Sequence, residues 1–354
     1  MVDERAPVAG AVDAHSAGEL AVVGAGSWGT TLAVVYARGG RDVTLWDRDA
    51  ARARTIDDTR ENRRYLPDVR LPDGIGVTSD LAVAVRGRPL VVLAVPAQAA
   101  RGVATALCPH LAPETVVVVA AKGLEVGSGK RMTEVVAESL RARQRRGVAV
   151  LSGPNLAGEI VRGLPAASVV AARHRPSAVL AQRLLSTGRF RLYISTDVAG
   201  VELGGALKNV MALVAGLADG LGYGDNGKAS IMTRGLAEIA RLGVAAGARQ
   251  ATFAGLSGLG DLIATCSSPL SRNYHVGYEL GQGRTLEEIR GAMSSVAEGV
   301  TTTRAALELA ARYGVELPIV TQVGAVLFEG KNPHDAVTEL LTRAARDELT
   351  GEAL

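Results

Sequence analysis

The chain has 354 residues, of which 47% are hydrophobic, and a formal net charge of +3 at pH 7. This length favours two domains, and the apolar fraction is ample for two cores. The low net charge, an aromatic content of 3% and a single short basic run at residues 141–146 argue against a nucleic-acid-binding protein.

The first eighteen residues contain charges and no apolar core, so we expect a disordered extension rather than a secretory signal. The longest apolar runs fall short of the roughly 20 residues that a membrane span needs, which predicts no membrane insertion. Two cysteines that form no motif fit a reducing compartment, and five histidines without ligand spacing predict no metal site. We therefore expect a cytoplasmic protein.

The first element predicted along the chain is a strand at residues 19–23, followed at once by a glycine motif and a helix-like segment. In a dinucleotide-binding unit, Gly24 would allow the tight turn, Gly26 would let the backbone approach a pyrophosphate, and Gly29 would let helix and strand pack closely. Because the chain has 42 glycines, a structural turn is the alternative. The order of strand, turn and helix favours nucleotide binding.

A second strand-like run at residues 42–46 ends at Asp47 and Arg48, about where such a unit reads the adenosine ribose. A carboxylate accepts hydrogen bonds from the ribose hydroxyls and repels a 2′-phosphate, whereas a guanidinium attracts that phosphate. Since both are present, the choice between NAD and NADP stays open.

Strand-like runs then recur between helical segments, at residues 90–95, 115–120, 148–151, 167–171 and 190–194. This alternation predicts a mostly parallel sheet covered on both faces. From about residue 198 onward, helical periodicity takes over, at residues 230–247, 302–313 and 333–348. The predicted fold class is an α/β Rossmann-type dinucleotide-binding domain at residues 19–197, followed by an all-α substrate and catalytic domain at residues 198–354.

Three turns follow successive strands of the first domain, at Pro96, at Lys122 and at residues 152–157. Each could simply end its strand. The carboxyl ends of parallel strands meet at the edge where open α/β sheets bind ligands, so three such turns in succession favour a site there.

Lys208 is the one charged residue between Glu202 and Asp219, in a segment that is apolar on all sides. An unpaired ammonium in a buried helix would cost several kcal/mol, so this lysine must find a partner, lose its proton or face a polar cavity. Buried lysines are common proton carriers in enzymes. The alternative is a lysine whose ammonium reaches the surface at the shoulder of a helix.

A glycine-rich turn at residues 255–261 ends in Asp261, which apolar residues follow. Such a carboxylate needs a partner once buried, and Lys208 is the natural candidate; an ordinary helix N-cap is the alternative. Glu298 is predicted to lie in a loop-like stretch, where it could bind a ribose or an amide.

Ser271, Arg272 and Asn273 precede a helix-like segment. A hydroxyl, a guanidinium, an amide and free backbone N–H groups at a helix start form an anion site, and phosphate fits it well. The alternative is simple capping by Ser271 beside an incidental arginine.

Taken together, these motifs resemble the bacterial-type NAD(P)-dependent glycerol-3-phosphate dehydrogenases, in the family's order and over about residues 20–348. The matching segments are residues 24–29, 121–125, 152–154, 204–209, 233–238, 258–261 and 271–273. The resemblance implies hydride transfer between a nicotinamide cofactor, NAD or NADP, and C2 of dihydroxyacetone phosphate. The product would be sn-glycerol 3-phosphate for glycerophospholipid synthesis.

The resemblance also implies roles for individual residues. Lys208 would be the acid/base, with Asp261 as its catalytic partner. The substrate would be surrounded by Lys122, Gly153, Lys208, Asp261, Ser271, Arg272 and Asn273. The cofactor would contact the glycine turn and Ser27, Trp28, Arg48, Tyr65, Lys122, Ala157, Arg272, Val296 and Glu298.

Two rival interpretations remain at this point. The β-hydroxyacid and 6-phosphogluconate dehydrogenases also place a lysine on a central helix, but they would require a site for a substrate carboxylate. A non-enzymatic NAD(P) sensor would not need a buried lysine beside a phosphate site. Asn155 departs from the small hydroxyl residue common in the family, which puts a substrate contact there in doubt. The sequence leaves a homodimer through the helical half open.

Overall fold

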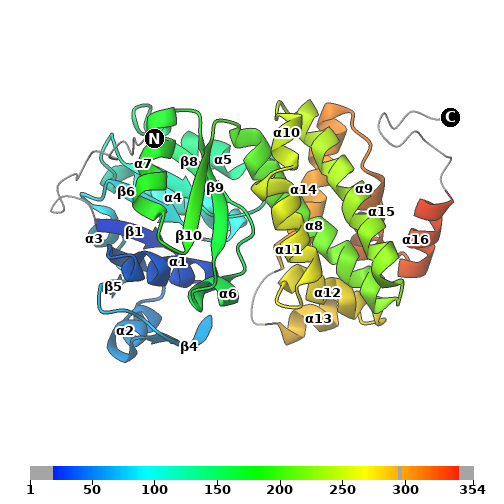
Figure 1. Ribbon diagram of the computed structural model, residues 1–354, viewed down its shortest axis with the longest axis horizontal. Helices are drawn as coiled ribbons and strands as arrows, with labels where there is room; N and C mark the ends of the chain where they lie inside the picture. Colours follow the sequence, from blue (N-terminus) through cyan, green and yellow to red (C-terminus); the bar gives the residue numbers. More distant parts are fainter. Residues whose placement is uncertain (1–18, 294–296, 343–354) are drawn as a thin grey trace, which may run out of the picture.

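The computed structural model describes residues 19–293 and 297–342. Figure 1 shows an α/β half and an all-helical half side by side. The last strand of the sheet, β10, ends at Ser195, and the first helix of the helical half, α8 (Val198–Gly220), begins three residues later. The predicted fold class, a mostly parallel α/β sheet followed by helices, is confirmed.

The main sheet has eight strands in the order β10-β9-β8-β7-β6-β1-β2-β5. All neighbours pair in parallel except β8 with β9. Its central strands β6 and β7 are buried along their whole length, which explains their unbroken apolar sequences. The strands are β1 (Glu19–Val23), β2 (Asp42–Trp46), β5 (Ile75–Thr78), β6 (Leu90–Leu93), β7 (Val116–Val119), β8 (Val148–Ser152), β9 (Ala166–Ala172) and β10 (Phe190–Ser195).

Helices lie on both faces of this sheet (Figure 1). They are α1 (Ser27–Arg38), α2 (Ala50–Thr59), α3 (Leu81–Val85), α4 (Ala100–Leu107), α5 (Met132–Ser139), α6 (Ala157–Val161) and α7 (Arg175–Leu185). The edge strand β5 and the hairpin of β3 (Glu61–Asn62) and β4 (Leu66–Arg70) were not predicted. These strands are short and only partly buried, so they lack the apolar runs that mark the central strands.

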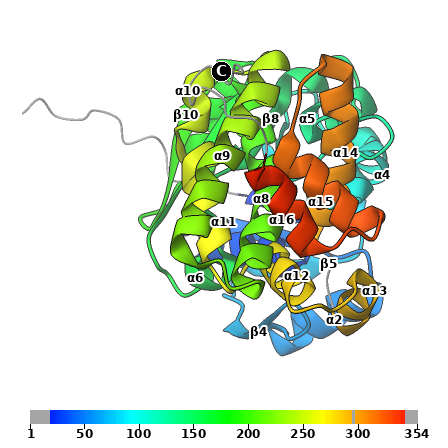
Figure 2. The same cartoon turned by 90° about the vertical axis from the view of Figure 1, so that its right-hand side faces the viewer.

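The helical half is built around α8, which lies among α9, α11, α12 and α14. The helices after α8 are α9 (Gly224–Ala245), α10 (Gln250–Phe253), α11 (Asp261–Ser267), α12 (Arg272–Gly281), α13 (Leu286–Ala292), α14 (Glu298–Tyr313), α15 (Pro318–Phe328) and α16 (Pro333–Leu341). In Figure 2, α15 and α16 face the viewer on the outer side of this half. Of the helix predicted at residues 333–348, the part beyond residue 342 lies outside the described residues.

Glycines bring α8 and α12 into backbone contact. A Cβ on Gly216 would lie 2.0 Å from the Tyr274 carbonyl oxygen, and one on Gly277 would lie 1.9 Å from that of Leu213. By length and composition, α8 could cross a membrane, but 94% of its most apolar window is buried inside the protein. It is therefore the core helix of this half.

A buried ion pair ties α8 to the α/β half. Glu202 of α8 accepts hydrogen bonds from Arg131 Nη1 at 2.9 Å and from the Thr133 backbone N–H at 2.7 Å. Burial raises the pKa of Glu202, and the Arg131 charge opposes that shift. This contact fixes α8, and with it Lys208, against the first turn of α5.

Candidate active site

The glycine turn between β1 and α1 has the geometry of a dinucleotide cradle. Gly24 adopts φ +116°, and a Cβ there would lie 2.7 Å from the Ala94 carbonyl oxygen. A Cβ on Gly29 would lie 1.9 Å from the Gly24 carbonyl oxygen, whereas one on Gly26 would meet nothing within 4 Å. The backbone at Gly26, the N-cap of α1, is therefore open to a pyrophosphate, and no side chain caps it.

Asn62 supports this turn from the hairpin, and sequence reasoning missed it. Its buried Nδ2 donates to the Ala25 carbonyl oxygen and to Thr30 Oγ1, each at 2.8 Å. No local pattern marks Asn62, because its partners lie more than thirty residues away.

At the carboxyl end of β2 the two candidate ribose-reading groups differ in their surroundings. Asp47 is buried, and both of its carboxylate oxygens accept hydrogen bonds from Arg52. Arg48 is exposed at the same end. The Tyr65 ring lies 5.5 Å from the Arg52 guanidinium carbon and 5.3 Å from that of Arg64. The carboxyl end of β2 is thus rich in cations, and the buried Asp47 carboxylate is already paired.

Two lysines from different halves of the protein share one aspartate. Lys208 of α8 donates to Asp261 Oδ1 at 2.8 Å and to Thr265 Oγ1 at 2.5 Å. Lys122, which follows β7, donates to Asp261 Oδ2 at 2.6 Å and to the Gly153 carbonyl oxygen at 2.9 Å. Asp261 is fully buried and Lys208 is 7% exposed, so the surface-reaching alternative for Lys208 is wrong.

The cluster of Lys208, Asp261 and Lys122 holds two cations and one anion. Burial lowers the pKa of Lys122 to about 8, and the charge of Asp261 opposes that fall. The remaining positive charge suits an anionic ligand. Asp261 begins α11 after a π-helical turn, and its side chain binds the lysines rather than capping the helix. Thr265, which was not predicted, lies one helical turn after Asp261, and that spacing could have revealed it.

At the start of α12, Ser271 is the N-cap and its Oγ accepts a hydrogen bond from the Tyr274 N–H at 3.3 Å. The capping role proposed as an alternative for Ser271 is therefore present. Arg272 is exposed beside it, whereas Asn273 is buried and its Oδ1 accepts a hydrogen bond from the Gly299 N–H at 2.9 Å. Asn273 thus ties the start of α12 to the start of α14.

Glu298 is the first residue of α14, so the prediction of a loop-like stretch is wrong for this residue. In the first turn of this helix, the Gly299 N–H donates to Asn273 Oδ1. Glu298 Oε1 accepts a hydrogen bond from the Ala97 N–H, which follows β6, at 3.3 Å. Burial raises the pKa of Glu298 to about 7, and the Arg272 charge opposes that shift. Val296, a predicted cofactor contact, lies outside the described residues.

The other predicted cofactor contacts lie at helix starts. Ser27 and Trp28 begin α1, and Ala157 begins α6. The Trp28 ring packs edge-on against Phe190, with 6.4 Å between centroids.

Asn155 also lies in the turn after β8. Its Oδ1 accepts a short hydrogen bond from Ser168 Oγ at 2.5 Å. This contact agrees with the doubt about a direct substrate contact at that position.

The lysine–aspartate cluster and the residues at the start of α14 lie close together in the segment after β7. Lys122 belongs to the lysine–aspartate cluster, and the next residue, Gly123, lies against Glu298: a Cβ there would be 3.0 Å from Glu298 Oε2. Side chains from the sheet edge and from α8, α11, α12 and α14 are thereby brought together around Lys122 and Gly123.

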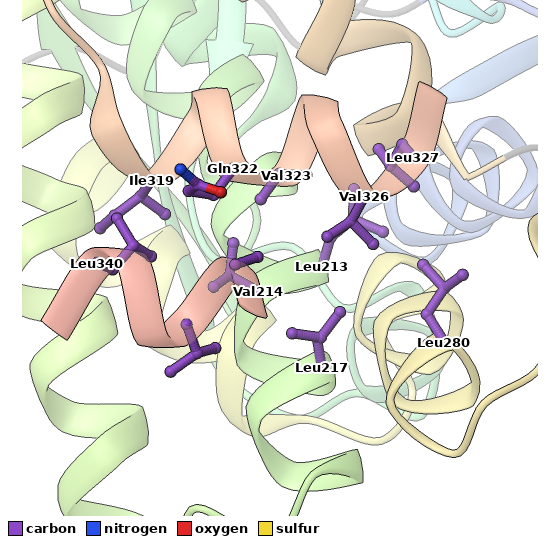
Figure 3. Close-up of a pocket in the computed structure, with 12 residues that line it drawn as sticks. Leu213, Val214, Leu217, Leu280, Ile319, Gln322, Val323, Val326, Leu327 and Leu340 are labelled. Atoms are coloured by element: carbon purple, nitrogen blue, oxygen red, sulfur yellow. The ribbon is translucent and has the colours of Figure 1, made fainter. Parts of the chain in front are cut away.

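Figure 3 shows a pocket elsewhere in the helical half, between α8, α12, α15 and α16. Its volume is about 30 Å³, and its lining is aliphatic apart from the amide of Gln322. With no titratable side chain in its wall, this pocket offers no group for proton transfer.

Comparisons with known proteins agree with this geometry. The family described as "NAD-dependent glycerol-3-phosphate dehydrogenase N-terminus" matches residues 19–178, and the corresponding C-terminus family matches residues 197–338. Glycerol-3-phosphate dehydrogenase (NAD(P)+) from Streptomyces coelicolor is 51% identical over 333 residues, covering 93% of this chain and 98% of that protein. The protein of the same name from Geobacter sp. is 48% identical over 330 residues, with the same coverage.

A solved structure shows the same similarity in three dimensions. The crystal structure of glycerol-3-phosphate dehydrogenase from Coxiella burnetii superimposes with a TM-score of 0.88 at 36% identity, covering 92% of this chain and 99% of that one. With both family regions matched and relatives near 50% identity over almost their full length, this chain belongs to the NAD-dependent glycerol-3-phosphate dehydrogenase family.

Proposed function

We propose that this protein reduces dihydroxyacetone phosphate to sn-glycerol 3-phosphate with NADH or NADPH, and that Lys208 is the acid that protonates the carbonyl oxygen. The observation that carries the assignment to Lys208 is its burial on α8 with its ammonium held by Asp261 and Thr265. The product would supply glycerophospholipid synthesis.

The residues present fit a nicotinamide dinucleotide. The open backbone at Gly26 and the start of α1 would hold the pyrophosphate, and Arg48 and Tyr65 would lie near the adenosine ribose. Arg52 forms an ion pair with Asp47, so the charge of that carboxylate is already compensated and repels a 2′-phosphate less. This pairing favours acceptance of NADPH. The reduced nicotinamide, when bound, supplies the hydride.

Lys208 would polarise the carbonyl of the substrate and donate a proton to its oxygen as the alcohol forms. In the reverse direction its neutral amine would accept that proton. Asp261 and Thr265 hold the ammonium from one side, which directs its remaining N–H toward a ligand. Lys122, at the other oxygen of Asp261, would add positive charge where the carbonyl oxygen becomes negative.

The start of α12 would bind the phosphate. Arg272 is exposed there, and the first backbone N–H groups of this ten-residue helix point out of its N-terminus. A guanidinium and a helix N-terminus together favour a phosphate over a carboxylate-bearing substrate. For this reason we prefer a phosphate ester to the substrates of the β-hydroxyacid dehydrogenases.

We place the protein in the cytoplasm, on the basis of its sequence. A homodimer through the helical half stays a prediction, to be checked by light scattering. The boundary between the two domains near residue 197 likewise stays a prediction.

The test is the initial rate of NADH and NADPH oxidation with dihydroxyacetone phosphate, compared with unphosphorylated dihydroxyacetone. Lys208→Met should lower kcat by roughly a hundredfold or more and leave cofactor affinity unchanged, because only the proton donor is lost. Lys130→Met is the matched control, since Lys130 pairs with Glu138 on the surface and contacts none of the cluster.

Near-normal turnover by Lys208→Met would exclude Lys208 as the acid. Cofactor binding by the wild-type protein without turnover of dihydroxyacetone phosphate would instead favour a sensor of NAD(P) over an enzyme.

A further inference from the structure

Two buried polar atoms on α14 have no hydrogen-bond partner among the described residues. They are Thr302 Oγ1 and Glu298 Oε2, and Thr302 is 1% exposed. A buried hydroxyl without a partner costs free energy in the folded protein, so native structures rarely keep one without a ligand, a water or a function. Thr302 was not predicted as a site residue.

Both atoms face the same point of the sheet edge. Thr302 lies four residues after Glu298, so the two side chains share one face of α14. A Cβ on Gly123, after β7, would lie 3.0 Å from Glu298 Oε2 and 3.7 Å from Thr302 Oγ1. The other oxygen of Glu298 holds the Ala97 N–H after β6. The unpartnered atoms therefore lie beside Gly123, at the carboxyl ends of β6 and β7.

The order of the sheet indicates which part of a dinucleotide would reach this point. Successive strands run outward on either side of β1 and β6, which makes their junction the switch point of the sheet. With the pyrophosphate at Gly26 and the adenosine over β2, the nicotinamide half would extend over β6 and β7. That half must also reach the substrate, which the cluster around Lys122 and Lys208 would hold.

The chemistry of the two atoms suits the carboxamide of a nicotinamide ring. A carboxamide carries two N–H donors and one carbonyl acceptor. A carboxylate oxygen can accept one N–H, and a threonine hydroxyl can donate to the carbonyl or accept the second N–H. The neighbouring Thr303 differs, because its buried hydroxyl already donates to the Gly299 carbonyl oxygen at 2.8 Å.

We propose that the Thr302 hydroxyl, acting with Glu298 Oε2, binds the carboxamide of the nicotinamide ring and so fixes the orientation of that ring. This inference rests on the proposed function, because it requires a nicotinamide cofactor. It adds to that function a cofactor-binding residue on the helical half, one helical turn into α14.

The test compares Thr302→Val with the matched control Thr303→Val, because valine keeps the volume and removes the hydroxyl. Calorimetric titration would measure the Kd of each variant for NADH and for ADP-ribose, which lacks the nicotinamide. Thr302→Val should weaken NADH by about fivefold to tenfold, the loss of one hydrogen bond, and leave ADP-ribose unchanged. Thr303→Val should leave the ratio of the two Kd values at its wild-type level.

Thermal unfolding without cofactor provides a second measurement. Since Thr302→Val removes an unpartnered hydroxyl, its Tm should equal or exceed that of the wild type, whereas Thr303→Val should lower it. Unchanged NADH affinity in Thr302→Val, the result expected if only water fills the gap, would overturn the proposal. Equal losses for NADH and ADP-ribose would overturn it as well.

These outcomes are distinct from a failure of the proposed function. If the wild type binds NADH but does not reduce dihydroxyacetone phosphate, the reaction is wrong, and the comparison of NADH with ADP-ribose still decides the role of Thr302.

Discussion

Replacing Asp261 by asparagine tests whether this carboxylate stabilises the two lysines of the site by its charge. The substitution keeps the shape of the side chain and removes the single anion between Lys208 and Lys122, whose ammonium groups lie 2.8 and 2.6 Å from its oxygens. Breaking a buried ion pair typically costs about 3–5 kcal/mol. We expect the lower end of this range, because burial already lowers the pKa of Lys122 to about 8 and this lysine can shed its proton.

The lowered pKa of Lys122 also determines how the stability lost by Asp261→Asn depends on pH. Without Asp261, the folded-state pKa of Lys122 should fall further below its unfolded value, so the unfolded chain binds more protons than the folded one. Stability lost by Asp261→Asn should therefore be largest near neutral pH and should diminish as pH rises toward the unfolded pKa of lysine. A loss of about 3 kcal/mol corresponds to a fall in Tm of roughly 4 °C for a chain of 354 residues, at about 2.1 cal/mol/K of unfolding entropy per residue.

The assay is thermal unfolding of the wild type and of Asp261→Asn without cofactor, at about pH 7 and about pH 9.5. Asp225→Asn, on the exposed first turn of α9, is the matched control and should change Tm little at either pH. Turnover of dihydroxyacetone phosphate should fall by roughly a hundredfold or more, because the proton donor loses its charge partner. An unchanged Tm, or the same fall in Tm at both pH values, would refute the electrostatic role of Asp261.

Three further predictions concern the ligand-facing side chains. Arg272→Ala should raise KM for dihydroxyacetone phosphate far more than KM for dihydroxyacetone in steady-state assays; equal effects on the two would exclude a phosphate contact. Arg48→Ala should narrow the ratio of kcat/KM for NADPH to that for NADH, and an unchanged ratio would exclude a 2′-phosphate contact. Glu298, whose pKa is raised to about 7 from an ordinary value of 4.5, favours folding less as pH rises through that range. Glu298→Gln should therefore reduce the fall in Tm between about pH 5 and about pH 8. The same dependence of Tm on pH in the variant and the wild type would contradict a raised pKa for Glu298.

The central strands and the chemistry of the main candidates could be predicted from the sequence alone. The buried strands β6 and β7 are continuous apolar runs, and the glycine turn follows a strand and precedes a helix with the spacing of a dinucleotide-binding unit. Lys208 was recognisable because one charge in an apolar helix needs a partner. Each of these signals is local, since it depends on residues within a turn or two along the chain.

Contacts between distant segments were decided by the tertiary structure. Lys122 reaches Asp261 across 139 residues, and both carboxylate oxygens of Asp47 accept hydrogen bonds from Arg52. Asn273 holds the Gly299 N–H in the first turn of α14, and the short strand β5 pairs with β2 at the edge of the sheet. Thr302 gives no signal in the sequence, because a threonine in a helix is unremarkable until its hydroxyl is found buried without a partner. Local patterns report which groups need partners, whereas the packing of the two halves determines which partners they find.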